Sequence, residues 1–273
     1  MNWAAEFEAA QHRRSANVVC MKWGTLYGPE WVNKLYGMVV RNTTWNVRFV
    51  CLTDDNRGIR KEVECLPLPA LALDRRAHVN GRKDDPWWNK VSLYRKDLHD
   101  LSGMTLYLDL DVVIVSSIDD LFTYPGRFCM MPIWRADRYG GKLGNSSVTR
   151  LFVGAESNIY ERFVSQPSMH WEAMYHGHEQ SFVCASAEDL TFFPPQWCVS
   201  FKSCLPRNAV VRFFSEPILP PDAKIIVFFG ANTPYAALKG EINPGKKWGA
   251  WRRFSPYKKR FRPAPWVAEH WSE

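Results

Sequence analysis

The sequence lacks several features that would each indicate a particular class of protein. None of its apolar runs approaches the roughly 20 residues that a membrane-spanning helix needs. The first fifteen residues carry two glutamates and two arginines where a signal peptide would have its apolar core. The seven cysteines are scattered and include no C-x-x-C pair, which favours reduced core thiols over a zinc site or a disulfide framework. We therefore expect a cytoplasmic protein.

Internal repeats, low-complexity linkers and phosphate loops of the G-x-x-x-x-G-K type are also missing from the 273 residues. With 46% hydrophobic and 23% charged residues, the composition is that of a globular protein. Patterns typical of strands and helices alternate in the first half, which favours an α/β fold. We predict one α/β domain over residues 1–240 and a C-terminal appendage over residues 241–273.

The net charge of +7 is concentrated in the appendage. Residues 246–262 contain eight basic residues, no acidic ones, and several interleaved aromatic rings. A segment of this kind is typical of one that binds anionic lipid, nucleic acid or a phosphorylated substrate. The alternative is a solvated tail whose aromatic rings pack on the domain. Nothing that reads bases accompanies the charge, so we expect no nucleic-acid partner. Peripheral contact with an anionic membrane, at its inner surface, stays open as a hypothesis.

The first half of the chain predicts a strand-helix-strand unit. Residues 17–23 and 47–53 are apolar strands, and the helix between them begins at Pro29. Such a unit is expected to be parallel and right-handed, with ligands beyond the carboxyl ends of its strands, at residues 22–27 and 53–56. Further strands are predicted over residues 63–68, 128–134 and 224–229, and helices over residues 88–98, 156–164 and 176–183.

Residues 106–115 form the most informative stretch, because eight of the ten are apolar yet Asp109 and Asp111 lie among them. A single buried strand would place both carboxylates on one face. Burying two unpaired carboxylates is costly, and a divalent cation between them would remove most of that cost. The alternative is that they pair with Lys or Arg or cap the following turn. Lys90, in the helix leading to this strand, is either close to the pair or solvated.

Two histidines, His176 and His178, stand next to Glu179 and invite comparison with a metal site. Their spacing lacks the i, i+4 arrangement of a helical zinc site. We expect surface or helix-cap roles for both.

Several stretches, in this order, resemble the nucleotide-sugar glycosyltransferases of the GT-A fold, in particular the glycogenin-like and bacterial galactosyltransferase-like group. The matching stretches are residues 18–27, 49–55, 87–90, 107–111, 145–148, 179–180, 200–202 and 227–234, and residues 266–271 resemble the end of small bacterial members. The resemblance implies a single GT-A (Rossmann-like) domain, with a mixed, mostly parallel central sheet flanked by helices.

The resemblance also implies how a donor is held. Asp109 and Asp111 would hold Mn²⁺ or Mg²⁺ against the diphosphate of a nucleotide sugar, with UDP as the expected nucleotide. A hard cation with oxygen ligands stabilises the charge that forms on the departing diphosphate. Lys90 would add positive charge near the phosphates or ribose.

The remaining implied roles concern the base and the sugar. Thr25 and Tyr27 match the loop that holds the base, and Lys22 and Asp54 lie in the same nucleotide half. Asn145 would reach sugar hydroxyls, while Glu179 and Gln180 would lie near the reacting sugar. The expected reaction is metal-dependent transfer to a glycan or lipid-linked acceptor with retention of configuration.

One departure from the family pattern is Phe229, which stands where the family commonly has a metal-binding histidine. Phenylalanine has no atom that binds a metal. Water, a donor phosphate or another side chain such as His270 would have to take that place. A non-catalytic nucleotide-sugar binder is therefore an alternative to the enzyme, and a basic nucleic-acid binder is the least favoured hypothesis.

Overall fold

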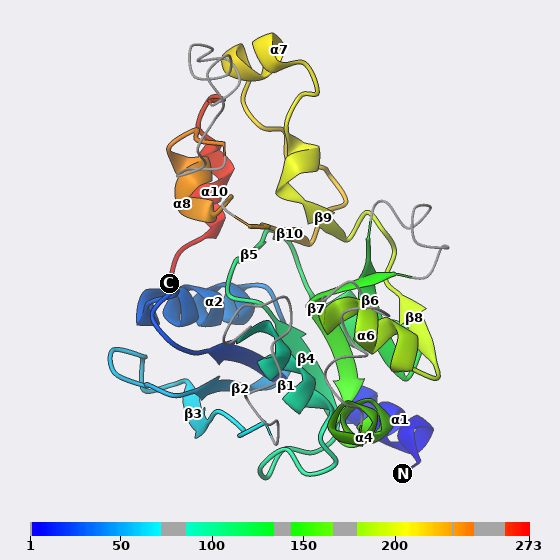
Figure 1. The fold of residues 1–273 in the computed structure, drawn as a ribbon. Helices are drawn as coiled ribbons and strands as arrows, with labels where there is room; N and C mark the ends of the chain where they lie inside the picture. The colour runs from blue at the N-terminus through cyan, green and yellow to red at the C-terminus, as the bar shows by residue number, and fades with distance from the viewer. Residues whose placement is uncertain (1, 72–85, 134–142, 166–178, 231, 243–259) are drawn as a thin grey trace.

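The computed structural model describes residues 2–71, 86–133, 143–165, 179–230, 232–242 and 260–273 (Figure 1). Its helices are α1 Trp3–Arg13, α2 Pro29–Arg41, η1 Pro86–Tyr94, α3 Asp119–Thr123, α4 Ser157–Ser165, α6 Glu179–Ser186, η3 Phe201–Cys204, α7 Ala209–Phe214, α8 Pro234–Leu238 and α10 Pro265–His270. Its strands are β1 Ser15–Lys22, β2 Asn46–Thr53, β3 Glu64–Pro67, β4 Met104–Leu108, β5 Val112–Ile114, β6 Phe128–Pro132, β7 Gly144–Phe152, β8 Leu190–Phe192, β9 Cys198–Ser200 and β10 Ile225–Val227. None of these helices is long and apolar enough to cross a bilayer.

The strands form two sheets. The larger has the order β3-β2-β1-β4-β7-β6-β8, and the smaller has the order β5-β10-β9. In the larger sheet the first four strands are parallel, β7 runs antiparallel between β4 and β6, and β8 is parallel to β6. The prediction of a mixed, mostly parallel sheet is confirmed. The unit of β1, α2 and β2 is parallel, as expected.

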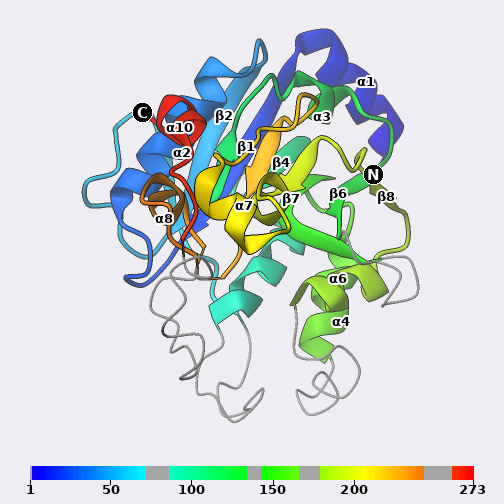
Figure 2. The same cartoon turned by 90° about the horizontal axis from the view of Figure 1, so that it is seen from above.

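Alternating side chains of the central strands pack into two separate cores. In β1, Val18 and Cys20 join one core with α2, whereas Val19 and Met21 join the other, with η1, α4 and α6. Both faces of the sheet are therefore covered, which is why β1 is apolar almost throughout. Figure 2 shows α4 and α6 on the opposite side of the sheet from α2.

Residues 106–115 do not form the single strand that the apolar run predicts. β4 ends at Leu108, the chain turns, and β5 pairs antiparallel with β10 in the smaller sheet. Backbone contacts stabilise this turn, because the N–H of Asp109 donates to the carbonyl of Ser147 at 2.9 Å and the N–H of Phe228 donates to that of Asp111 at 3.1 Å. The two aspartates therefore occupy the junction of two sheets.

Two other expectations need correction. The helix predicted over residues 88–98 is a 3-10 helix that ends at Tyr94, and within it the Ser92 hydroxyl donates to the carbonyl of Asn89 at 2.6 Å. The strand predicted over residues 224–229 is shorter, since β10 comprises only Ile225–Val227. The helix predicted over residues 176–183 is described only from Glu179 onward.

The described part of the C-terminal segment packs on the domain. Trp271 lies 5.1 Å from Trp31 of α2 and 4.5 Å from Tyr235 of α8, measured between ring centroids. The Lys34 ammonium lies 3.7 Å from the centre of the Trp271 ring. Residues 243–259, which hold most of the basic segment, lie outside the described residues.

Candidate functional site

The turn that carries Asp109 and Asp111 lies at the carboxyl ends of the parallel strands. Lys22 ends β1 and pairs in register with Thr53, which ends β2. Because β7 runs antiparallel to β4, its first residues come to this same edge, where Val148 pairs with Leu108. The topology therefore gathers polar side chains from distant parts of the chain at one place.

Asp109 lies between a cation and a hydroxyl. The Lys90 ammonium is 2.7 Å from its carboxylate, and the Tyr107 hydroxyl donates to Oδ1 at 2.8 Å. The side chains of Lys90 and Asp109 are only 10% and 16% exposed. Burial lowers the pKa of Lys90, but the charges of Asp109 and Glu179 outweigh it, so its pKa is raised and the ammonium stays protonated. Asp109 therefore pairs with a lysine, as one of the two alternatives from the sequence predicted, and it does so close to Asp111.

Asp111 is stabilised less well than its neighbour. It accepts a hydrogen bond from the Tyr27 hydroxyl at 3.2 Å. Burial and the charge of Asp109 raise its pKa to about 7, against the opposing effects of Lys90 and Tyr27. The pair thus carries more buried negative charge than one lysine neutralises. Two carboxylates in this state fit a divalent cation, whose preferred ligands are oxygens.

No third metal-binding residue joins the pair within the described ranges, because no group of three His, Cys, Asp or Glu side chains there is arranged to hold a metal ion. His270 therefore does not complete the site. Phe229 follows directly after Phe228, whose backbone N–H donates to the carbonyl of Asp111. His176 and His178 lie outside the described residues.

A second polar group comes from β7 and α6. The Ser146 hydroxyl donates to Glu179 Oε2 at 2.9 Å, and the Asn145 amide donates to Gln180 Oε1 at 3.1 Å. The Glu179 Oε1 atom is buried without a hydrogen-bond partner among the described residues. Burial raises the pKa of Glu179 to about 7, Asp109 adds to the rise, and Lys90 and Ser146 oppose it. This carboxyl group is therefore a buried acceptor that only Ser146 partners among the described residues.

The loops after β1 and β2 are tied together. Lys22, which is 4% exposed, donates from Nζ to the carbonyl of Asp55 at 3.1 Å. Asp54 accepts a hydrogen bond from the backbone N–H of Gly24 at 2.9 Å. Thr25 is exposed in the loop after β1. In the structure, Lys22 and Asp54 thus connect these loops, while Tyr27 reaches the carboxylate pair.

Sequence reasoning missed two participants, Tyr107 and Ser146. Tyr107 could have been predicted from the sequence, because residues two apart in a strand share one face and Tyr107 is two residues before Asp109. Ser146 follows directly after Asn145, but its contact with Glu179 depends on the packing of α6 against β7, which no local pattern reveals.

No protein-family model and no curated protein matches this sequence. Solved structures do match it in fold. An active-site variant of the galactosyltransferase LgtC aligns over 92% of this chain and 98% of its own, with 13% identity and a TM-score of 0.51. LgtC in complex with donor and acceptor sugar analogues aligns over 93% and 96%, with 12% identity and a TM-score of 0.50. Mouse xyloside xylosyltransferase 1 aligns over 81% and 99%, with 15% identity and a TM-score of 0.52.

These matches define the class of fold. The chain has the GT-A fold of glycosyltransferases, with the structural resemblance to the galactosyltransferase-like group extending over most of its length. At 11–15% identity the likeness concerns the fold alone.

Proposed function

We propose that this protein is a metal-dependent glycosyltransferase that moves a sugar from a nucleotide-sugar donor, with UDP as the nucleotide, to a glycan or lipid-linked acceptor. The observation that carries the proposal is the pair Asp109 and Asp111, placed at the junction of the two sheets of a GT-A fold with Lys90 and Tyr27 in contact. A partly buried pair of carboxylates with one lysine beside it favours a divalent cation, and a nucleoside diphosphate brings phosphate oxygens to share that cation.

In this proposal each polar group has its own task. Asp109 and Asp111 hold Mn²⁺ or Mg²⁺, which when bound supplies positive charge to the departing diphosphate. Lys90 adds a second positive charge at the same place, and burial makes that charge more effective than it would be in water. Tyr27 orients Asp111 through its hydroxyl.

The base and the sugar are held on either side of this centre. Lys22, Thr25 and Asp54 line the loops proposed to hold the nucleoside. On the other side, Glu179, Asn145 and Gln180 lie near the reacting sugar. Retention of configuration is part of the proposal because of the family resemblance.

A second candidate function is binding of a nucleotide sugar without transfer. Phe229 favours it, since the described chain supplies two carboxylates and no third ligand to the metal. Such a site would depend on the donor itself for further oxygen ligands.

One experiment separates the two candidates. Hydrolysis and transfer are measured over a panel of nucleotide sugars with Mn²⁺, alongside calorimetric titration with UDP. Asp111→Ala is expected to abolish activity, and Asp97→Ala, at a side chain that is 83% exposed, serves as the matched control. UDP binding without turnover on any donor would favour the binder, and activity restored by Phe229→His would identify an enzyme with a weakened metal site. Full activity in Asp111→Ala would reject the proposed mechanism.

A further inference from the structure

A finger of chain, residues 205–217, carries α7 and takes no part in the site described above. Its base is closed by two hydrogen bonds. The backbone N–H of Ile218 donates to the carbonyl of Cys204 at 2.9 Å, and the indole N–H of Trp266 donates to that of Pro217 at 3.0 Å. Figure 1 shows α7 at the top of the molecule, beyond the smaller sheet as seen from the larger one. The finger is thus a defined projection of the domain.

Large apolar side chains are exposed along this finger and at its base. α7 buries none of its six residues. The exposed fractions are 53% for Val210, 49% for Val211, 62% for Phe214 and 71% for Ile218. Eight large hydrophobic side chains in the described ranges are exposed, and these four of them fall within nine residues. A concentration of this kind on a projection marks a surface that contacts an apolar partner.

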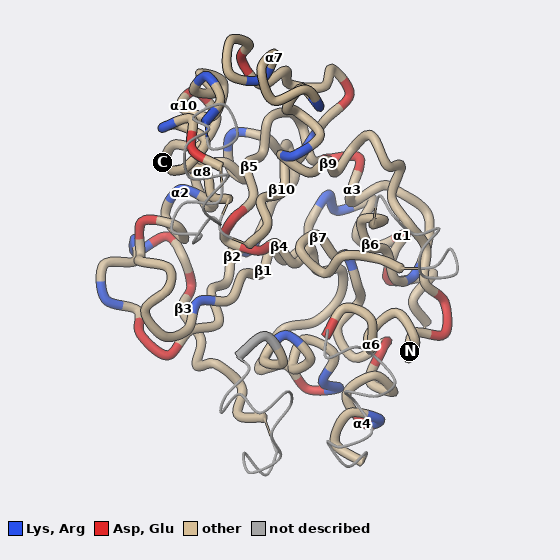
Figure 3. Tube along the Cα trace, turned by 45° about the horizontal axis from the view of Figure 1, so that its top comes forward, with Lys and Arg blue, Asp and Glu red and all other residues tan. Residues whose placement is uncertain are grey.

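Basic residues surround the apolar ones. Lys202, Arg207 and Arg212 precede a single acidic residue, Glu216, which lies 3.7 Å from the guanidinium of Arg262. Figure 3 shows both basic and acidic residues around α7. The surface therefore combines apolar side chains with excess positive charge, and its complement is apolar and negatively charged.

We propose that the finger inserts its apolar side chains into the head-group region of an anionic lipid bilayer. A folded partner or a second copy of the chain would need roughly 20 to 30 residues a side for a stable interface, more than this finger offers. A bilayer requires no such complementary shape, because binding grows with buried apolar area and with attraction of Lys and Arg to anionic lipids. The surface goes beyond the proposed function, since it would act whether or not the protein transfers a sugar.

The position of the finger also bears on the acceptor. It follows β9, which pairs with β10, and Phe228 at the end of β10 contacts the backbone of Asp111. One small sheet therefore connects the membrane-contacting element to the carboxylate pair. This consequence, which rests on the proposed function, favours an acceptor anchored in the same lipid surface.

Vesicle co-sedimentation of the full chain tests the proposal. Phosphatidylcholine vesicles with phosphatidylglycerol are expected to bind it, and those without should bind it far less. Val210→Ser, Val211→Ser and Ile218→Ser together should weaken binding about tenfold or more. The matched control, Val40→Ser with Val164→Ser, changes side chains that are 49% and 42% exposed on α2 and α4, and it should bind normally.

Two further measurements test the role of the basic residues and the identity of the segment that contacts the vesicles. Arg207→Gln with Arg212→Gln should weaken binding to anionic vesicles by about fivefold for each charge removed. Hydrogen exchange should slow at the amides of residues 209–214 when anionic vesicles are added, and stay unchanged in α1.

Two results would overturn the proposal, provided that thermal unfolding shows each variant to be folded. One is normal vesicle binding by the triple serine variant with protection only outside the finger. The other is a wild-type dimer that the triple variant breaks, because the finger would then cover a second copy of the chain.

Discussion

The two aspartates of the site have the same chemistry and different surroundings. Asp109 receives the Lys90 ammonium and the Tyr107 hydroxyl, whereas Asp111 receives the weaker hydrogen bond from Tyr27. When two buried carboxylates lie close together, the one with less support takes the proton. Burial first, and then the charge of Asp109, raise the pKa of Asp111 to about 7.

The raised pKa makes Asp111 a cost to stability in the metal-free protein. A folded-state pKa near 7, above the ordinary 3.8, means that ionisation between these values destabilises the fold, and the loss is complete above about pH 7. Asp111→Asn is therefore expected to raise the midpoint of thermal unfolding at pH 8 by roughly 2–4 °C, and to abolish the stabilisation by Mn²⁺ with UDP. The gain should vanish near pH 4. A lower midpoint at pH 8 would contradict the charge argument.

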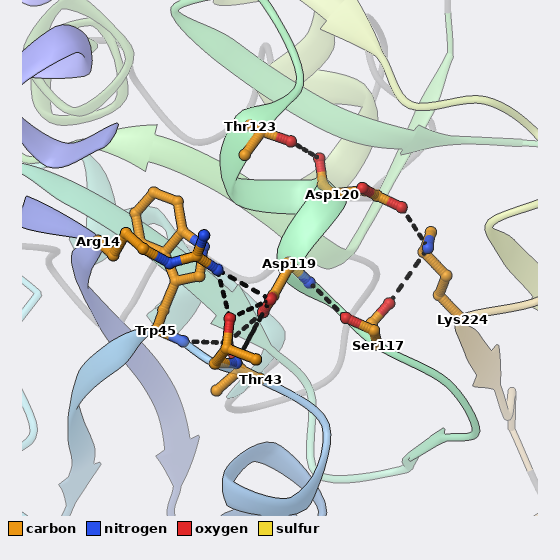
Figure 4. Close-up of polar contacts among 9 residues, drawn as sticks. Arg14, Thr43, Trp45, Ser117, Asp119, Asp120, Thr123 and Lys224 are labelled. Carbon is orange, nitrogen blue, oxygen red and sulfur yellow. Dashed lines mark hydrogen bonds and ion pairs between the residues drawn. The ribbon is translucent and has the colours of Figure 1, made fainter. Parts of the chain in front are cut away.

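At the level of elements, the carboxylate of Asp119 connects three segments of the chain outside the candidate site (Figure 4). Asp119 at the start of α3 accepts hydrogen bonds from the Thr43 hydroxyl at 2.6 Å and the Thr44 backbone N–H at 3.0 Å, between α2 and β2. Arg14, at the C-terminal end of α1, lies 3.2 Å from the same carboxylate. Here every partner is a donor or a cation, so the ionised form is favoured.

The pH dependence at Asp119 should accordingly have the opposite sign. Burial acts to raise its pKa, but the hydrogen bonds from Thr43 and Thr44 and the charge of Arg14 lower it. Its contribution is present above the unfolded-state pKa of about 3.9 and is lost as the pH falls through the folded value. In urea unfolding at pH 7, Asp119→Asn should cost about 1–2 kcal/mol, and the difference should shrink below about pH 4. Asp97→Asn is the exposed control and should change little; equal losses in both variants would contradict this role.

For the whole molecule, the described chain offers the metal two carboxylates and no further protein ligand. Metal and nucleotide are therefore expected to bind together, each completing the surroundings of the other. The carboxylate pair comes from the link between two sheets, so their joint binding should stabilise the entire fold by linkage.

Thermal unfolding measures this coupling directly. Mn²⁺ alone and UDP alone should shift the midpoint little, whereas together they should add about 2.7 kcal/mol at a hundredfold excess over their dissociation constant. In Phe229→His, Mn²⁺ alone should raise the midpoint, because the histidine supplies a third ligand. A large shift of the wild-type protein with Mn²⁺ alone would show that another residue completes the site.

Local patterns in the chain were sufficient to predict much of the fold. The apolar runs at β1 and β2 and the helical spacing after Pro29 predicted a parallel α/β unit, since buried parallel strands must be apolar on both faces. The order of the motifs predicted the GT-A fold, and the aspartates among apolar residues predicted a carboxylate pair. The parallel unit and the carboxylate pair follow from periodicity and burial, which neighbouring residues determine, whereas the GT-A fold was implied by the resemblance to a known family.

Other features depended on contacts between distant segments. The break after Leu108 occurs because β5 pairs with β10, more than a hundred residues later in the chain, and no pattern within residues 106–115 indicates it. Likewise the contact of Lys90 with Asp109, and that of Ser146 with Glu179, depend on the packing of η1 against α4 and α6 and of α6 against β7. The sequence by itself determined which strands are apolar and which residues can carry charge. Only the tertiary structure decided which charges meet, because that depends on how two sheets join at the turn between β4 and β5.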